Sequence, residues 1–189
     1  NARDASDPAD EAWAEWAELF DVSAPASWAK TPIVYHASSH ASGHGDVVWS
    51  AGEYLAARIL AHGALFDVAI ERARVLELGA GTGLAGLVCA AAADGAVLTL
   101  TDANAAVLAN LRYSLSLNAL PSARCRPCDF YAAEPGAAYD VVLAADCVAS
   151  PDDADALLAT VAASLAPGGT AWVVCAAAAN RYGTERVAA

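Results

Sequence analysis

Apolar positions change their period several times from residue 74 onward. Short runs of branched apolar residues, bounded by Gly, Pro, Asp or Asn, predict buried strands. Between these runs, apolar residues recur every three or four positions and predict helices. The predicted strands cover residues 74–78, 97–101, 124–128, 140–144 and 170–176, and the predicted helices cover 82–93, about 103–118 and 151–165.

Strands that alternate with helices predict an α/β domain with right-handed crossovers. We expect a Rossmann-like, doubly wound, mostly parallel sheet with helices on both faces. Ligands of such sheets bind at the carboxyl ends of the strands. The last predicted strand, residues 170–176, would be an edge strand with apolar faces. We therefore expect this edge to be a contact surface.

Two regions divide the chain. We expect residues 1–31 to form an acidic helix and its connector, and residues 32–189 to form the α/β domain. The helix is amphipathic, and its apolar face either docks onto the domain or contacts another protein. Both interpretations stay open. The apolar positions of this helix are Trp13, Trp16, Leu19 and Phe20.

The domain begins with a predicted short strand at residues 32–36, for which residues 46–49 are a candidate return strand. A helix follows at Ser50. Glu53 lies three residues further on, which is a capping-box pattern. This helix should end near Gly63.

Charge narrows the classes of partner. The formal net charge is −12, and the sequence pI is about 4.4. This field disfavours nucleic acid and would steer basic protein partners inward. Alternatively, the surplus Asp and Glu only keep an alanine-rich surface soluble. No stretch reaches the roughly 18 apolar residues that spanning a bilayer requires, so we expect no direct membrane insertion.

The cysteines and histidines do not predict a metal site. Five cysteines, an odd number, lack the pattern of a disulfide framework. Cys125 and Cys128 have the spacing of a zinc or redox pair, but the sequence lacks a second pair. His36, His40 and His44 lie in a loop rich in Ser and Gly. We expect an intracellular, reducing compartment, either the cytoplasm or an organelle interior reached through a targeting peptide that has been removed.

A glycine-rich turn directly follows the strand at residues 74–78. Gly79, Gly81 and Gly83 let the backbone approach a ligand where a Cβ would collide. A dinucleotide pattern starts at Gly81, but the fingerprint fails in register when it is counted from Gly79. Glu77 at the strand end would repel a pyrophosphate and suits a ligand with a cationic amino-acid end.

Asp102 ends the second strand, 21 residues after Gly81 (102 − 81). A carboxylate at this point accepts hydrogen bonds from both hydroxyls of a ribose. Alternatively, Asp102 caps the helix that follows. Together with Glu77 and the glycine turn, it favours an adenosyl ligand.

Residues 75–84, Val-Leu-Glu-Leu-Gly-Ala-Gly-Thr-Gly-Leu, resemble the first motif of class I, seven-strand methyltransferases. The chain is most similar to the methyltransferase 16 family of protein-lysine methyltransferases. This resemblance covers about residues 33–182. It implies S-adenosylmethionine as cofactor, bound by Glu77, Gly79, Ala80, Gly81, Gly83 and Asp102.

Three further stretches carry the narrower resemblance. Residues 48–51 are similar to the family segment whose Trp packs beside the cofactor, which implies this role for Trp49. Asp129 and Phe130 occupy the place of the Asp-Trp pair whose ring covers the adenine. Ala145 and Asp146 match the residues that close the fourth strand near the methyl group. The resemblance therefore implies cofactor contacts for Asp129, Phe130 and Ala145.

We expect a methyltransferase that acts on a protein lysine, with Asp146 orienting or desolvating the amine. The family commonly has Tyr three residues after that Asp, where this chain has Ala149. The family fold also continues with a helix and an antiparallel strand pair, so the domain should be C-terminally truncated. The alternative is a noncatalytic methyltransferase-fold subunit or scaffold of a larger assembly. A nicotinamide-dependent oxidoreductase is a further alternative, although no Tyr-Lys proton relay follows the turn.

Overall fold

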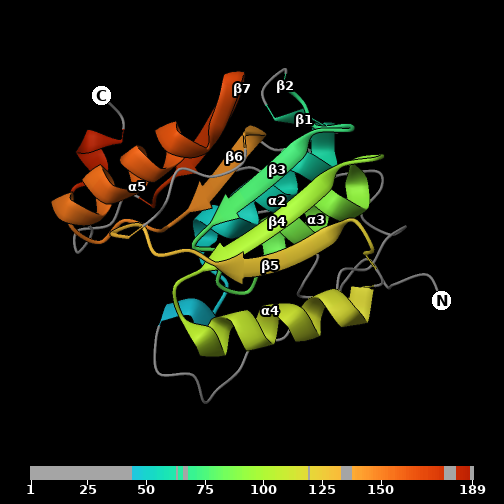
Figure 1. Cartoon of the computed structure of the whole chain (residues 1–189), viewed down its shortest axis with the longest axis horizontal. Coiled ribbons are helices and arrows are strands. Elements are labelled where there is room, and N and C mark those ends of the chain that lie inside the picture. The colour runs from blue at the N-terminus through green and yellow to red at the C-terminus, as the bar shows by residue number, and fades with distance from the viewer. Residues whose placement is uncertain are drawn as a thin grey trace, which may run out of the picture.

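A five-stranded, all-parallel sheet forms the centre of the fold (Figure 1). The computed structural model describes residues 44–62, 64–65, 68–118, 120–132, 138–176 and 182–187, so the predicted acidic helix, the predicted strand at 32–36 and the predicted domain boundary at 31 lie outside it. The strand order is β5 (Ala123–Pro127), β4 (Val97–Asp102), β3 (Arg74–Leu78), β6 (Tyr139–Ala145) and β7 (Leu165–Val174).

The two central strands bury side chains on both of their faces, as parallel strands covered on both sides must do. In β3, Val75 faces one apolar cluster, and its neighbour Leu76 faces the other. In β6, Leu143 faces the same cluster as Val75, and Val142 faces the same cluster as Leu76. This burial explains why the two strands read as nearly continuous apolar runs.

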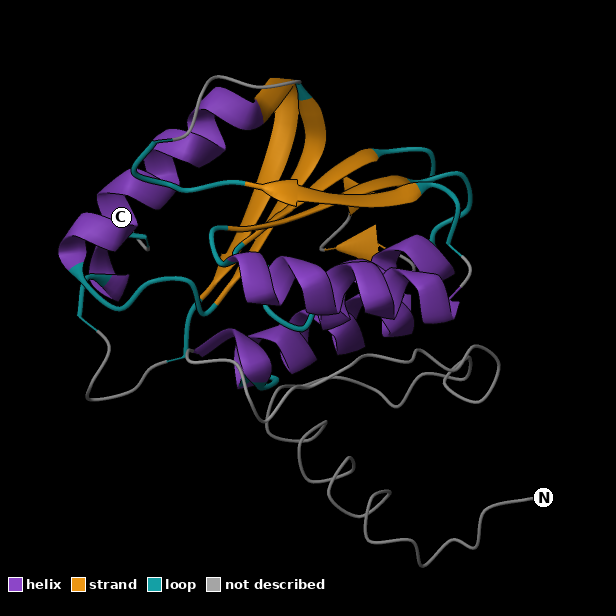
Figure 2. Cartoon of the chain, turned by 60° about the horizontal axis from the view of Figure 1, so that its bottom comes forward, coloured by secondary structure: helices purple, strands orange, loops and turns teal. Residues whose placement is uncertain are grey.

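Helices cover both faces of the sheet, which confirms the doubly wound architecture. On one face lie α2 (Ser50–His62), α3 (Leu84–Ala92) and α4 (Ala105–Asn118), whose buried side chains share one cluster with β3 and β4. On the other face lies α5 (Pro151–Ser164), which packs through Leu157 and Val161. Figure 2 shows α5 on the opposite side of the strands from the other three helices.

Most predicted bounds agree with the structure to within two residues, but three regions differ. Residues 46–49 are not a strand; η1 (His44–Asp46), a 3-10 helix, leads through them into α2. A short antiparallel pair, β1 (Ala64–Leu65) and β2 (Val68–Ala69), was not predicted. The last strand, β7, begins at Leu165, five residues early, and its register against β6 shifts between Tyr139 and Val141. Residues 167–169 are accommodated by this irregularity.

The sheet places a crevice between β3 and β6. The chain runs outward from β3 through β4 to β5, and then returns to β6 on the other side of β3. The connections therefore leave β3 and β6 in opposite directions, which opens a ligand site at their carboxyl ends.

At the far end of the sheet, β7 is an edge strand among the described residues, as expected. In the same part of the chain, no helix is long and apolar enough to cross a membrane.

Candidate functional site

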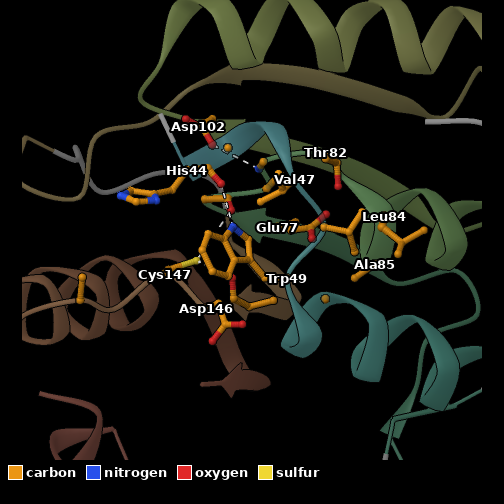
Figure 3. A pocket seen from close by; sticks show the side chains of 18 of the residues that line it. His44, Val47, Trp49, Glu77, Thr82, Leu84, Ala85, Asp102, Asp146 and Cys147 are labelled. Carbon is orange, nitrogen blue, oxygen red and sulfur yellow. Dashed lines mark hydrogen bonds between the residues drawn. The ribbon is translucent and has the colours of Figure 1, made fainter. Parts of the chain in front are cut away.

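A cavity of about 250 Å³ opens at the carboxyl ends of β3 and β6 (Figure 3). Nine of the eleven residues predicted to form the site line it. Gly83 and Asp129 are the two that do not. The nine lining residues are Trp49, Glu77, Gly79, Ala80, Gly81, Asp102, Phe130, Ala145 and Asp146.

The glycine turn brings backbone against the cavity. Gly79 and Gly81 have φ angles of +59° and +54°, in the left-handed region that favours glycine. A Cβ at Gly79 would lie 2.7 Å from the Cys147 Sγ and 3.3 Å from the Phe130 Cζ. The Ala80 N–H donates to the Thr101 carbonyl over 2.8 Å and ties the turn to β4. The turn is therefore a cradle that any side chain at position 79 would fill.

Glu77 is the only carboxyl group in the described residues whose side chain is almost completely buried, at 3% exposure. Its Oε2 accepts a 3.0 Å hydrogen bond from the Gly86 N–H in the first turn of α3. A Cβ at Gly86 would lie 2.3 Å from this oxygen, so only glycine allows the helix to approach so closely. Gly86 is the last glycine of the dinucleotide pattern that starts at Gly81, and no other feature of the sequence had indicated it.

Burial, with a smaller contribution from the nearby Asp102 carboxylate, raises the pKa of Glu77 to about 8. The Gly86 hydrogen bond opposes this shift but does not cancel it. The carboxyl group is therefore mostly protonated at neutral pH. A cationic ligand beside it would favour the ionised form, so the cavity is suited to a positively charged amino group.

Asp102 organises the other side of the turn. Its Oδ2 accepts the Gly81 N–H at 3.2 Å, and its Oδ1 accepts the Asn104 N–H at 2.9 Å. The following helix is capped by Asn104, whose Oδ1 accepts the Ala106 N–H at 2.8 Å, so Asp102 is not the cap itself. Its carboxylate lines the cavity, where it can accept hydrogen bonds from a ribose.

The segment before α2 forms the opposite wall of the cavity. The Trp49 Nε1–H donates to the His44 carbonyl over 2.7 Å. The centroids of the Trp49 and His44 side-chain rings lie 5.9 Å apart. Figure 3 shows the indole of Trp49 beside Cys147, across the cavity from Asp102. Trp49 keeps 37% of its surface exposed, so a flat face remains available to a ligand. This wall explains why residues 46–49 do not pair as a strand.

Asp146 clamps three elements together at the end of β6. Its Oδ2 accepts the Ala51 N–H at the start of α2 over 3.3 Å, and its Oδ1 accepts the Ala176 N–H over 2.7 Å. Its own N–H donates to the Val174 carbonyl at 2.8 Å, and its φ is +54°. A strained backbone held by such contacts is typical of functional sites. The predicted catalytic role of Asp146 stays a prediction, and the clamp is a structural role that the sequence did not show.

Gly83 and Asp129 support the site from outside the cavity. Gly83 precedes α3, and a Cβ there would lie 2.6 Å from the Leu111 Cδ2, so this glycine is required by packing. Asp129 is exposed, and its Oδ1 accepts the Tyr131 N–H at 3.0 Å. Asp129 therefore shapes the turn that carries Phe130 to the cavity.

The structure adds lining residues that the sequence analysis had not named as contacts, although Val48, Thr82 and Leu84 lie within its motif stretches. The Cys147 thiol donates to the Leu78 carbonyl at 3.2 Å, and burial strongly raises its pKa, so it fills space and is not a reactive thiolate. All five cysteines lie in the described part of the chain, and none forms a disulfide. The additional lining residues are His44, Gly45, Val47, Val48, Gly52, Thr82, Leu84, Ala85, Cys147 and Ala149.

A doubly wound parallel sheet, with a glycine cradle, a buried carboxyl group and Asp102 at its switch point, defines a Rossmann-like methyltransferase fold. The chain belongs to the lysine methyltransferase family, whose sequence model matches residues 30–186. This membership confirms the expected family and, with it, S-adenosylmethionine as the cofactor. It also argues against the oxidoreductase alternative.

A solved structure shows the same fold. PKMT2 from Rickettsia typhi is 19% identical, with a TM-score of 0.50 over 55% of this chain and 21% of that chain. Two others are similar over part of the chain. The CcbJ methyltransferase from Streptomyces caelestis is 25% identical, with a TM-score of 0.46 over 53% and 41%. A TehB-like SAM-dependent methyltransferase from Corynebacterium glutamicum is 20% identical, with a TM-score of 0.48 over 62% and 59%. The chain spans less than two thirds of each of these proteins. No curated protein matches it significantly.

The raised pKa of Glu77 predicts a pH-dependent stability. Between an ordinary carboxyl pKa of 4.5 and the folded value of about 8, the folded protein holds a proton that the unfolded chain has lost. Stability therefore falls as the pH rises through this window. Replacing Glu77 with the neutral isostere (Glu77→Gln) should leave the melting temperature unchanged at pH 4.5 and raise it by several degrees at pH 8.

Thermal denaturation of the ligand-free protein at the two pH values measures this effect. Asp129→Asn, which alters an exposed carboxylate outside the cavity, is the matched control and should follow the wild type at both. An equal melting temperature of Glu77→Gln and wild type at pH 8 would show that burial does not hinder ionisation of Glu77.

The clamp at Asp146 predicts a second effect on stability. Asp146→Ala leaves two backbone N–H groups without their acceptor and should lower the free energy of unfolding by about 1–3 kcal/mol. Asp146→Asn keeps one acceptor oxygen and should cost less. Urea denaturation of both variants measures the difference. Unchanged stability of Asp146→Ala would contradict the clamp and leave Asp146 with a chemical role alone.

Proposed function

We propose that the chain is an S-adenosylmethionine-dependent methyltransferase whose acceptor is a lysine of a protein. The observation that carries this proposal is the charge of the cavity. Three carboxyl groups line it, those of Glu77, Asp102 and Asp146, and His44 is the only basic residue among the described lining residues. Such a lining suits both a cationic cofactor and a cationic acceptor.

Cofactor contacts follow from the lining residues. Glu77 and the Gly79–Gly81 turn would bind the amino-acid end, and the Asp102 carboxylate would accept the ribose hydroxyls. The rings of Trp49 and Phe130 offer apolar faces for the adenosyl group. The cradle at Gly79, which a Cβ would fill, supports this fit.

Methyl transfer requires little covalent chemistry from the protein. The bound cofactor would supply an activated methyl group. The lysine that arrives as an ammonium must lose a proton before transfer, and the protein must position the resulting neutral amine in line with the methyl group and exclude water. Asp146 lies at the end of β6 on the cavity wall, where it would orient the amine. Its two backbone contacts hold it in one position for this role.

The charge of the whole chain supports a basic protein as the partner. A net charge of −12 would attract a lysine-rich segment and repel nucleic acid. Five free cysteines are consistent with the reducing, intracellular compartment expected from the sequence.

A noncatalytic subunit or scaffold is the second candidate function. Ala149 lines the cavity without a functional side chain, and both its backbone groups are engaged, its N–H with Asp153 and its carbonyl with the Tyr182 N–H. The wall beside Asp146 thus offers an acceptor no aromatic or polar side chain at this position. This observation favours a domain in which the methyltransferase fold is kept for binding and not for catalysis.

The proposed cofactor site predicts that substitution of two aspartates will affect the Kd for S-adenosylmethionine differently. Asp102→Ala removes the ribose acceptor and loosens the turn at Gly81, so we expect its Kd for S-adenosylmethionine to rise at least about tenfold. Asp94→Ala, at an exposed position before β4 and therefore at the opposite end of the sheet, should stay within about twofold of wild type. Isothermal titration calorimetry measures both. Equal losses in the two variants would indicate that the cofactor binds elsewhere.

The acceptor is tested with radiolabelled S-adenosylmethionine on an array of lysine peptides and a matched array in which every lysine is acetylated. We expect methyl incorporation only into free lysines. Cofactor binding without incorporation into either array would favour the scaffold. Incorporation into the acetylated array would identify an acceptor other than lysine.

A further inference from the structure

A loop that starts at one edge of the sheet carries Phe130 to the cavity. In the described sheet, β4 and β3 lie between β5 and β6. The described part of the loop after β5, residues 128–132 (the β5 loop), nevertheless reaches the crevice, because a Cβ at Gly79 would lie 3.3 Å from the Phe130 Cζ. Figure 1 shows the chain passing from the end of β5 toward α5. Phe130 can keep this position only if the loop is held at its far end.

Tyr131 joins the β5 loop to the first turn of α5. Its hydroxyl donates to the Asp153 Oδ1 over 2.6 Å, a short distance that is typical of a charged acceptor. Tyr131 is 64% exposed, so the hydrogen bond, and not packing, fixes the direction of its side chain. Further along α5, the Thr160 hydroxyl lies 3.4 Å from the Phe130 carbonyl and adds a longer contact to the same loop.

The same carboxylate holds a second loop of the cavity wall. The Asp153 Oδ2 accepts the Ala149 N–H at 3.1 Å, in the loop between β6 and α5, residues 146–150 (the β6 loop). The Asp153 N–H in turn donates to the Ser150 Oγ over 3.2 Å, which fixes Asp153 itself. Phe130 of the β5 loop and Ala149 of the β6 loop both line the cavity. One carboxylate therefore connects two loops of its wall.

The charges of the two groups favour this hydrogen bond at neutral pH. Partial burial alone would raise the pKa of Asp153, but hydrogen bonds from Tyr131, Ser150 and the Ala149 N–H outweigh burial and lower this pKa. The hydrogen bond to Asp153 raises the pKa of the Tyr131 hydroxyl above its ordinary value. A protonated phenol thus donates to an ionised carboxylate, which makes the hydrogen bond charge-assisted.

We propose that Tyr131 and Asp153 are positioning residues of the cofactor site, and that their hydrogen bond holds the β5 and β6 loops in the arrangement that binds the cofactor. Neither side chain lines the cavity, so both act through Phe130 and Ala149. The proposal rests on the binding of S-adenosylmethionine in this cavity and does not depend on the acceptor. Its physical basis is a population effect. The observed Kd rises in inverse proportion to the fraction of molecules whose loops are in position.

Calorimetric titration with S-adenosylmethionine tests the hydroxyl of Tyr131. Tyr131→Phe keeps the ring and removes the donor, and it should raise the Kd about three- to tenfold, the range that one hydrogen bond supplies. Tyr182→Phe is the matched control, because Tyr182 is equally exposed, at 65%, and its backbone N–H donates to the Ala149 carbonyl of the same β6 loop. It should stay within about twofold of wild type. A wild-type Kd of Tyr131→Phe would overturn the proposal.

A double-variant cycle separates positioning from two unrelated structural effects. Asp153→Ala removes the acceptor of both loops and should raise the Kd further than Tyr131→Phe does. Because the Tyr131 hydroxyl acts through Asp153, Tyr131→Phe should cause no additional loss in the Asp153→Ala background. Losses that add in the double variant would show that the two residues act independently and would overturn the proposal.

Hydrogen exchange of the cofactor-free protein measures the loops without reference to binding. The amides of residues 131 and 132 in the β5 loop, which donate to Asp129, should exchange at least about threefold faster in Tyr131→Phe than in wild type, while those of β3 stay unchanged. Unchanged exchange would show that the hydrogen bond does not hold the loop and would overturn the proposal.

The two measurements together distinguish this proposal from the proposed function. Faster exchange with an unchanged Kd would overturn the positioning role and leave the cofactor site intact. A wild-type protein that binds no S-adenosylmethionine would overturn the cofactor site itself, and with it the positioning role.

Discussion

The buried hydrogen bond between the Glu77 carboxyl group and the Gly86 N–H is the contact on which the site depends. It requires α3 to approach β3 so closely that no Cβ fits at position 86. The same approach sets the glycine turn between strand and helix, with Gly79 against Cys147 and Ala80 bonded to β4. Because β6 lies on the other side of β3, the turn opens into the crevice at the switch point of the sheet.

This contact also links stability to function. The Glu77 carboxyl group is buried among apolar side chains and accepts one backbone hydrogen bond. Its ionisation in this environment is unfavourable and lowers the stability of the folded protein. A cationic cofactor would remove this cost by pairing with the carboxylate. The protein therefore carries, at the centre of its fold, a group whose charge is best satisfied by the ligand. Asp102 and Asp146 differ, because each of their carboxylates accepts two backbone N–H groups, whereas Glu77 accepts one.

The sheet was predictable because its central strands are buried on both faces and have a strong apolar signal. β3 matches its predicted bounds, and α4 ends as predicted at Asn118. Interactions between distant residues were less accessible to sequence reasoning. Residues 46–49 have strand propensity, yet the hydrogen bond from Trp49 to His44 turns them into a cavity wall. The backbone donors that hold Asp146 come from residues 95 and 30 positions away, and no local pattern reveals such partners.

The central claim is that a buried, protonated Glu77 receives the cationic end of the cofactor. Calorimetric titration with S-adenosylmethionine at pH 6.5, in two buffers of different ionisation enthalpy, tests it most directly. Because the pKa of Glu77 is about 8 in the free protein, binding should release close to one proton per site, and the observed enthalpies should differ by nearly the full difference between the buffers. Binding with the same enthalpy in both buffers, or no binding at all, would contradict the account.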